Sequence, residues 1–63
     1  MITTQTLQSI RDGKPLHDEE SECTLWFSDA RQSFVITGRG NSFVIPGDTP
    51  KQIRRHVVAF SGV

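Results

Sequence analysis

The side chains best suited to chemistry begin with a short acidic stretch. The segment from His17 to Glu22 has the sequence HDEESE and runs into Cys23, so imidazole, carboxylate and thiol groups lie close together. A structural zinc site needs four well-placed ligands, however, and Cys23 opens an apolar run that favours burial. We therefore interpret residues 17–22 as a solvated acidic loop that can attract a basic partner, and we expect no metal and no cofactor.

Catalytic motifs are a second place to look for chemistry. The chain has no G-x-S-x-G, P-loop, H-E-x-x-H or paired-cysteine motif, and Gly38-Arg39-Gly40 lacks the third glycine of a dinucleotide-binding loop. His56 follows Arg55 beside a predicted apolar stripe, which favours a helix-surface histidine. A chain of 63 residues also has little volume for a water-excluding pocket. We expect no catalytic residue and no enzyme activity.

The remaining chemically active side chains are cationic. Lys51, Arg54 and Arg55 are close in sequence, and Arg39 lies in a predicted hairpin loop. Clustered cations bind nucleic acid largely through release of counterions from phosphates. Nucleic-acid binding through these four residues is therefore our alternative function. Seven basic and seven acidic residues balance in the chain, so no global positive field supports it, and a solvated helix face is the simpler interpretation.

Two helices are predicted to position these groups, one toward each end of the chain. Thr3 is a suitable N-cap for a helix over residues 4–12. A second helix is predicted to begin near Pro50, with Asp48 or Thr49 as its cap. Its apolar residues recur at helical spacing, which predicts one buried stripe: Ile53, Val57 and Phe60.

Between the helices, three runs rich in aromatic and β-branched residues predict strands over residues 23–28, 33–37 and 42–45. Loops of four residues, 29–32 and 38–41, would join them into antiparallel hairpins. Both loop lengths place the same side chains on one face, which is the predicted core: Leu25, Phe27, Phe34, Ile36, Phe43 and Ile45. The predicted fold class is therefore α+β. A three-stranded antiparallel meander is flanked by an N-terminal and a C-terminal helix (α-β-β-β-α) in a single domain over residues 1–63.

The opposite face of this sheet is our candidate binding site. It aligns Trp26, Val35 and Val44 in one row, with Thr24 and Thr37 beside it. If both helices cover the core face, this row contacts water or a partner, and Trp is a residue that binding hot spots favour. Two alternatives stay open: scattered exposed apolar residues are often simply tolerated, or a helix on each face buries the tryptophan.

Composition narrows the partner and the compartment. One cysteine excludes an internal disulfide and fits a reducing, cytoplasmic location. The longest apolar runs are far too short for a membrane span, and residues 1–20 lack a signal-peptide core, so no membrane partner is expected. The function predicted first is a small non-enzymatic protein-binding module, such as an inhibitor, adaptor or regulatory subunit. Self-association of two copies through the same face is another way in which this surface could act.

The predicted element order is similar to that of double-stranded-RNA-binding domains and of small HicA-type toxins that cleave mRNA. Residues 42–48 and 49–56 resemble the strand and helix at the end of a HicA toxin, which implies RNA as a substrate. The middle strand, residues 33–37, has no histidine, so the catalytic Gly-Ser-His-type motif of the toxins is missing. Only Lys51 matches the lysine-rich helix start of the RNA-binding domains. The resemblance is one of topology, and topology does not determine function.

Overall fold

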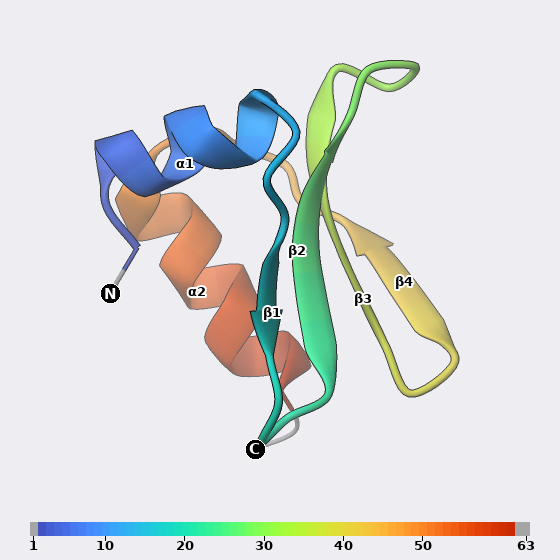
Figure 1. Ribbon diagram of the computed structural model, residues 1–63. Coiled ribbons are helices and arrows are strands. Elements are labelled where there is room, and N and C mark those ends of the chain that lie inside the picture. Colours follow the sequence, from blue (N-terminus) through green and yellow to red (C-terminus); the bar gives the residue numbers. More distant parts are fainter. Residues whose placement is uncertain (1, 62–63) are drawn as a thin grey trace.

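The computed structural model describes residues 2–61, which form two helices and a four-stranded antiparallel sheet (Figure 1). The strands lie in the order β1-β2-β3-β4, so each pairs with its neighbour in sequence. The predicted α+β class is confirmed, with one strand more than expected. The elements are α1 (Thr4–Arg11), β1 (Leu16–Asp18), β2 (Cys23–Ser28), β3 (Ser33–Gly38), β4 (Asn41–Val44) and α2 (Pro50–Phe60).

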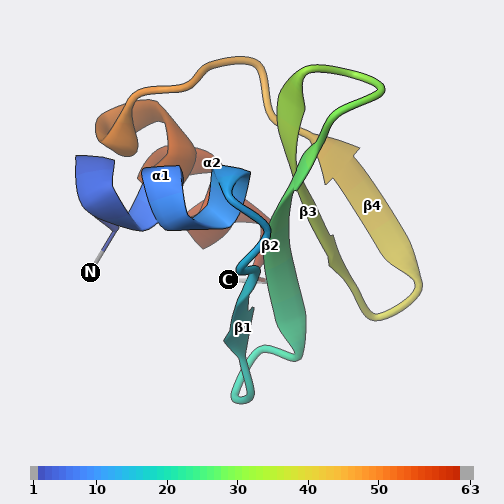
Figure 2. The same ribbon diagram turned by 45° about the horizontal axis from the view of Figure 1, so that its top comes forward.

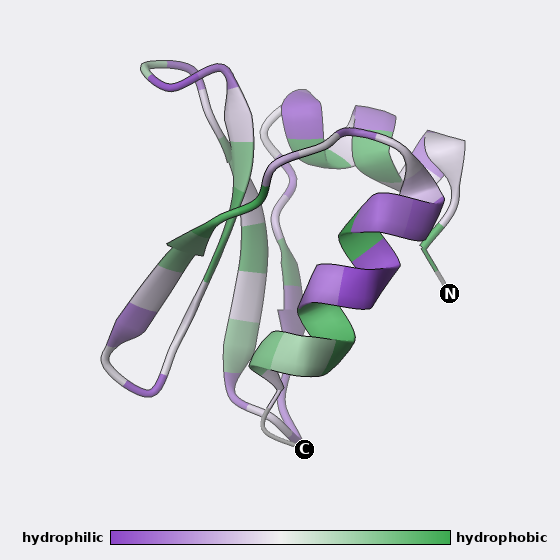
Figure 3. Cartoon of the chain, turned by 180° about the vertical axis from the view of Figure 1, so that it is seen from behind, coloured by the Kyte–Doolittle hydropathy of each residue, from purple (hydrophilic) through white to green (hydrophobic). Residues whose placement is uncertain are grey.

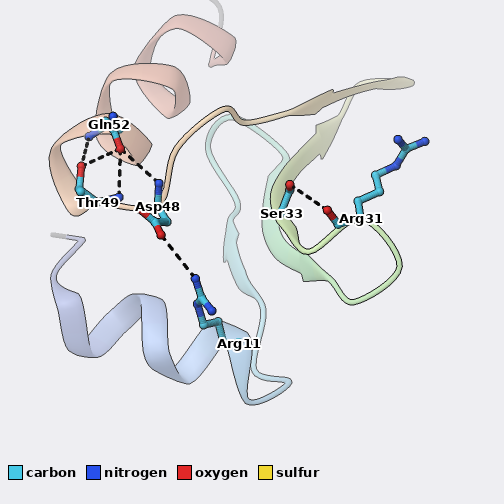
Figure 4. Close-up of polar contacts among 6 residues, drawn as sticks. All are labelled: Arg11, Arg31, Ser33, Asp48, Thr49 and Gln52. Carbon is cyan, nitrogen blue, oxygen red and sulfur yellow. Dashed lines mark hydrogen bonds and ion pairs between the residues drawn. The ribbon is translucent and has the colours of Figure 1, made fainter.

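Both helices begin at threonine caps. The Oγ1 atom of Thr3 accepts a hydrogen bond from the backbone N–H of Thr6 at 3.2 Å, which satisfies one open donor of α1. At the start of α2, Thr49 Oγ1 accepts from Gln52 N at 3.3 Å, and Gln52 Oε1 accepts from Thr49 N at 3.3 Å (Figure 4). This reciprocal pair is a capping box. Of the two predicted caps for α2, Thr49 is therefore the one used.

The predicted pairing register of the central strands is confirmed. Trp26 pairs with Val35 between β2 and β3, and Val35 pairs with Val44 between β3 and β4. The predicted four-residue loop at 38–41 is wrong, because Gly38 already pairs with Asn41. The backbone φ angles of Arg39 and Gly40 are 50° and 80°. Two successive positive φ angles are typical of a tight type I′ turn, which closes the hairpin in two residues.

Strand β1 was not predicted. His17 and Asp18, which we expected in a solvated loop, pair with Thr24 and Cys23 of β2, and only residues 19–22 form the turn. All three residues of β1 are exposed, so the segment carries no apolar alternation that would identify a strand. The expected acidic loop is therefore corrected to an edge strand followed by an acidic turn.

Both helices cover the same side of the sheet (Figures 1 and 2). Helix α1 packs mainly on β2 and α2 mainly on β3, so the core lies in a single layer between helices and sheet. Hydrophobic and hydrophilic bands alternate along α2 (Figure 3), as expected for a helix with one buried side. The buried side chains of this core are Ile2, Leu7, Ile10, Cys23, Leu25, Phe34, Ile36, Ile45 and Ile53. Val57 and Phe60 pack against them, as the predicted stripe requires.

Phe43 corrects the predicted core. Its side chain lies on the helix side of the sheet but is 42% exposed. Strand β4 is the edge of the sheet, and α2 does not extend over it (Figure 1). The Phe43 ring instead lies beside the His56 ring of α2, with 5.4 Å between the ring centroids. The edge strand therefore presents an aromatic side chain to solvent.

One close approach in the sheet requires glycine. A Cβ atom added to Gly38 would lie 2.6 Å from the backbone oxygen of Glu22 and 2.9 Å from the sulfur of Cys23. Both distances are shorter than nonbonded contacts allow, and one of the opposing atoms belongs to the backbone. The absence of a side chain at position 38 therefore allows the backbone of β3 to lie close to Glu22 at the end of the acidic turn.

We predict that Gly38→Ala lowers the free energy of unfolding by about 1–3 kcal/mol, because the strands must separate locally to admit the methyl group. Urea denaturation followed by circular dichroism measures it. Gly40→Asn is a control for the loss of a glycine in the same hairpin, since nothing lies within 4 Å of a Cβ there and any cost arises from the positive φ of 80° alone. A Gly38→Ala chain as stable as the wild type would contradict the close approach.

Candidate protein-binding surface

The side of the sheet that faces away from both helices is called the outer face below. Strand pairing aligns Trp26, Val35 and Val44 across it in one apolar row. The next row is polar and crosses all four strands: His17, Thr24, Thr37 and Ser42. The structure thus places all five residues predicted for partner binding on one face of the sheet, although Val35 itself is buried there.

Burial within the apolar row is uneven. Val35 is only 3% exposed although it lies outside the main core, because Trp26 and Val44 flank it on the neighbouring strands. Trp26 remains partly exposed, and Val44 is 40% exposed. The row therefore forms a small apolar ridge whose centre is packed and whose two ends contact solvent.

The polar row borders this ridge with hydroxyl groups. Thr24 and Thr37 are half-buried, and the Thr24 hydroxyl lies 2.8 Å from His17 Nδ1 in a hydrogen bond. Interfaces commonly place such a polar rim beside an apolar centre. His17 was assigned to a loop by sequence, so its place on this surface was missed. A three-residue strand with no apolar period gives no signal that would have located it.

The acidic turn lies at the far edge of the sheet and does not join the apolar row. The Ser21 hydroxyl donates to Asp18 Oδ2 at 2.7 Å and holds the pKa of that carboxyl below its usual value. Cys23 is buried, with its thiol directed to the Ser21 carbonyl at 3.3 Å. Within residues 2–61, no group of three or more His, Cys, Asp or Glu side chains is placed to hold a metal ion.

Two of the four cations predicted for nucleic-acid binding contact the chain itself. Arg39 donates to the Phe60 carbonyl at 2.6 Å and so caps the end of α2. The Arg54 guanidinium, on α2, donates to the Ile2 carbonyl at 2.8 Å. Arg54 is exposed, as expected, and in addition it ties α2 to the segment before α1.

The cations are also spread along the helix. Lys51 lies in the first turn of α2 and Arg39 beside its last residue, which at 1.5 Å per residue separates them by about 13 Å along the axis. Lys51 and Arg55 are exposed and can meet phosphates. Lys51 and Arg55 therefore remain available on α2, whereas Arg39 and Arg54 are bound to backbone carbonyls of the chain. The structure does not gather the four predicted cations into one patch.

Comparisons with protein-family models, with curated proteins and with solved structures gave no significant match. Among residues 2–61, neither helix has the length and apolar character needed to cross a bilayer.

We predict that Trp26, the single Trp in a chain without Tyr, is accessible to solvent in the monomer. Its emission should be quenched by iodide, to a smaller extent than that of a free tryptophan amide, because the ring is only partly exposed. Quenching and sedimentation on one dilution series measure accessibility and mass together. Blue, unquenched emission from a monomer at every dilution would contradict the exposed row.

Proposed function

We propose that this chain is a small non-enzymatic protein-binding module that docks on a larger protein through the outer face around Trp26. An inhibitor, an adaptor or a regulatory subunit acts in this way. The observation that carries the proposal is the apolar ridge of Trp26, Val35 and Val44 on a sheet face that neither helix covers. An antiparallel sheet that faces water on one side normally carries polar residues there.

The composition of this surface also supports recognition of a protein. Tryptophan supplies a large contact area at a small entropic cost, and it is enriched among residues that dominate binding energies. The half-buried threonines beside it supply hydrogen-bonding groups for a rim. Val35, at the centre of the ridge, is already buried between Trp26 and Val44, so docking requires little rearrangement there.

A hollow of about 310 Å³ lies between the end of α1, the start of β3 and the loop after β4. The charged groups in its lining, Arg11 and Asp48, pair with each other at 3.9 Å (Figure 4). The hydroxyl of Ser33, also in the lining, donates to the Arg31 carbonyl at 3.1 Å. The Ser33 hydroxyl thus donates to a backbone carbonyl and not to a histidine or carboxylate that could activate it as a nucleophile.

The decisive variant is Trp26→Ala. We predict that it weakens binding of the protein partner by about 2 kcal/mol or more, which is roughly 30-fold in Kd, because it removes the largest contact of the ridge. The partner is recovered with the immobilised full chain, identified, purified and titrated calorimetrically. Val58→Ala is the matched control, since Val58 is 61% exposed on α2, away from the outer face.

Further measurements on the same variants distinguish a protein partner from a second copy of the chain and from a nucleic acid. An unchanged Kd for a folded Trp26→Ala chain would refute the proposal. Self-association would instead give a Trp26-dependent dimer in sedimentation. A purified nucleic acid that binds with a steep salt dependence and is lost in Arg55→Ala, and not in Trp26→Ala, would establish the alternative function.

A further inference from the structure

Strand β4 leaves hydrogen-bonding groups at the edge of the sheet. The backbone N–H of Ile45 donates to the Phe34 carbonyl at 2.8 Å, so the pair Phe34–Ile45 is a hydrogen-bonded one. Bonded and non-bonded pairs alternate along an antiparallel ladder. The N–H and C=O groups of Ser42 and Val44 therefore point away from β3, to the side where residues 2–61 supply no further strand.

An apolar hollow lies on the helix side of this edge. Phe43 of β4 and three residues of α2, His56, Ala59 and Phe60, enclose a volume of about 190 Å³. A strand added beside β4 would direct every second side chain toward the helix side of the sheet. The side chain opposite Phe43 would then enter this hollow. Its neighbours would extend the outer face beside Val44.

The charged residues of α2 and of the turn before β4 are all cations, and Asp48, in the loop between β4 and α2, lies 3.9 Å from Arg11. Neither Asn41–Val44 nor Pro50–Phe60 contains an acidic residue. Lys51 and Arg55 of α2 are exposed and the turn before β4 carries Arg39, whereas Arg54 is bound to the Ile2 carbonyl.

Asp18, Glu19 and Glu20 lie at the opposite end of the strand order, in and after β1, whereas Glu22 lies beside Gly38 of β3. At about 4.8 Å per strand, the two edges are roughly 14 Å apart. The edge of β4 is thus complementary to acidic chain.

We infer that the edge of β4 is a strand-addition site for an extended acidic segment of a protein partner, with one large apolar side chain that fills the hollow beside Phe43. Main-chain hydrogen bonds to Ser42 and Val44 supply affinity, and the hollow with its flanking cations supplies specificity. The inference rests on the proposed role in protein binding and adds the edge where the partner pairs.

A second copy of this chain fits the edge less well. Two β4 strands paired about a twofold axis would place against one another two edges whose strand and neighbouring helix contain cations and no acidic residue. Like charges brought together at an interface are unfavourable. In the alternative contact, β1 of one copy pairs with β4 of the next. This contact would match opposite charges, but it is head-to-tail and would extend into an open chain of copies and not form a closed dimer. An extended acidic segment of another protein would pair with the outward backbone groups of β4 and would also place carboxylates near its cations.

The probe is a phage-displayed library of linear octapeptides selected on the immobilised full chain, and recovered peptides are then titrated by fluorescence anisotropy. Ser42→Pro removes the N–H that points outward and leaves the β3 ladder intact, as an edge strand tolerates. Ser42→Thr is its matched control, because it keeps the N–H. Ala59→Gln fills the hollow without touching the sheet. Arg55→Glu reverses a charge on α2, near the hollow. Arg31→Glu is its matched control, because it makes the same change of charge in the distant β2–β3 turn.

The expected peptides carry one large apolar residue with Asp or Glu two positions away. Their Kd should rise at least tenfold in Ser42→Pro and in Ala59→Gln, and severalfold in Arg55→Glu. Ser42→Thr and Arg31→Glu should leave it unchanged. Trp26→Ala should also leave it unchanged, since Trp26 lies two strands away from β4. A Ser42→Pro chain that fails to fold leaves Ala59→Gln to decide.

Other results would overturn the inference. These are peptides that bind Ser42→Pro and Ala59→Gln as tightly as the wild type, basic peptides, oligonucleotides that compete for the edge, or no peptide at all. Peptides that depend on Trp26 and not on Ser42 would refute the edge site while supporting the proposed function. Failure of the proposed function itself is seen separately, as an unchanged partner Kd in Trp26→Ala.

Discussion

The antiparallel pairing of β2 with β3 is the constraint on which the rest of the molecule depends. It places Leu25, Phe34 and Ile36 on one face and Trp26 and Val35 on the other. A shift of one residue would exchange these two sets and bury the wrong side chains. The four-residue turn between the strands and the contact of Gly38 with the end of the acidic turn both maintain this register.

Both helices follow from that choice of face. Ile53 of α2 and Leu7 of α1 are buried against the helix side of the sheet, and Arg54 joins the two ends of the chain through the Ile2 carbonyl. A chain of this size forms a single core layer, so one face of the sheet and its edge strands, β1 and β4, stay uncovered within residues 2–61. The apolar ridge, the edge of β4 and the segregated charges are therefore consequences of the same packing.

Local chemistry made the helices and the central strands predictable. Thr3, Thr49 and Pro50 mark helix starts by their capping preferences, and period-two alternation in the strands specified the register that the structure confirms. The five residues predicted for binding could be grouped because register alone determines which side chains share a face. Their exposure could not, since it depends on where the helices dock.

The remaining differences arise from tertiary contacts that sequence patterns do not encode. Strand β1 has no apolar period and forms only because β2 offers an edge. Phe43 has the residue type and position of a core side chain, but α2 covers β3 and not β4. Arg54 sits among cations in the sequence and finds a backbone carbonyl 52 residues away.

The most direct test of a sheet covered on one side is solvent accessibility measured atom by atom in the isolated chain. A water-soluble gadolinium chelate broadens NMR signals of nuclei close to solvent. This account predicts strong broadening at the Val44 methyl groups, the Trp26 indole and the Ser42 amide, and weak broadening at the Ile36, Ile45 and Ile53 methyl groups. Equal protection of Val44 and Ile45 in a monomer would contradict it, because both faces of the sheet would then be covered.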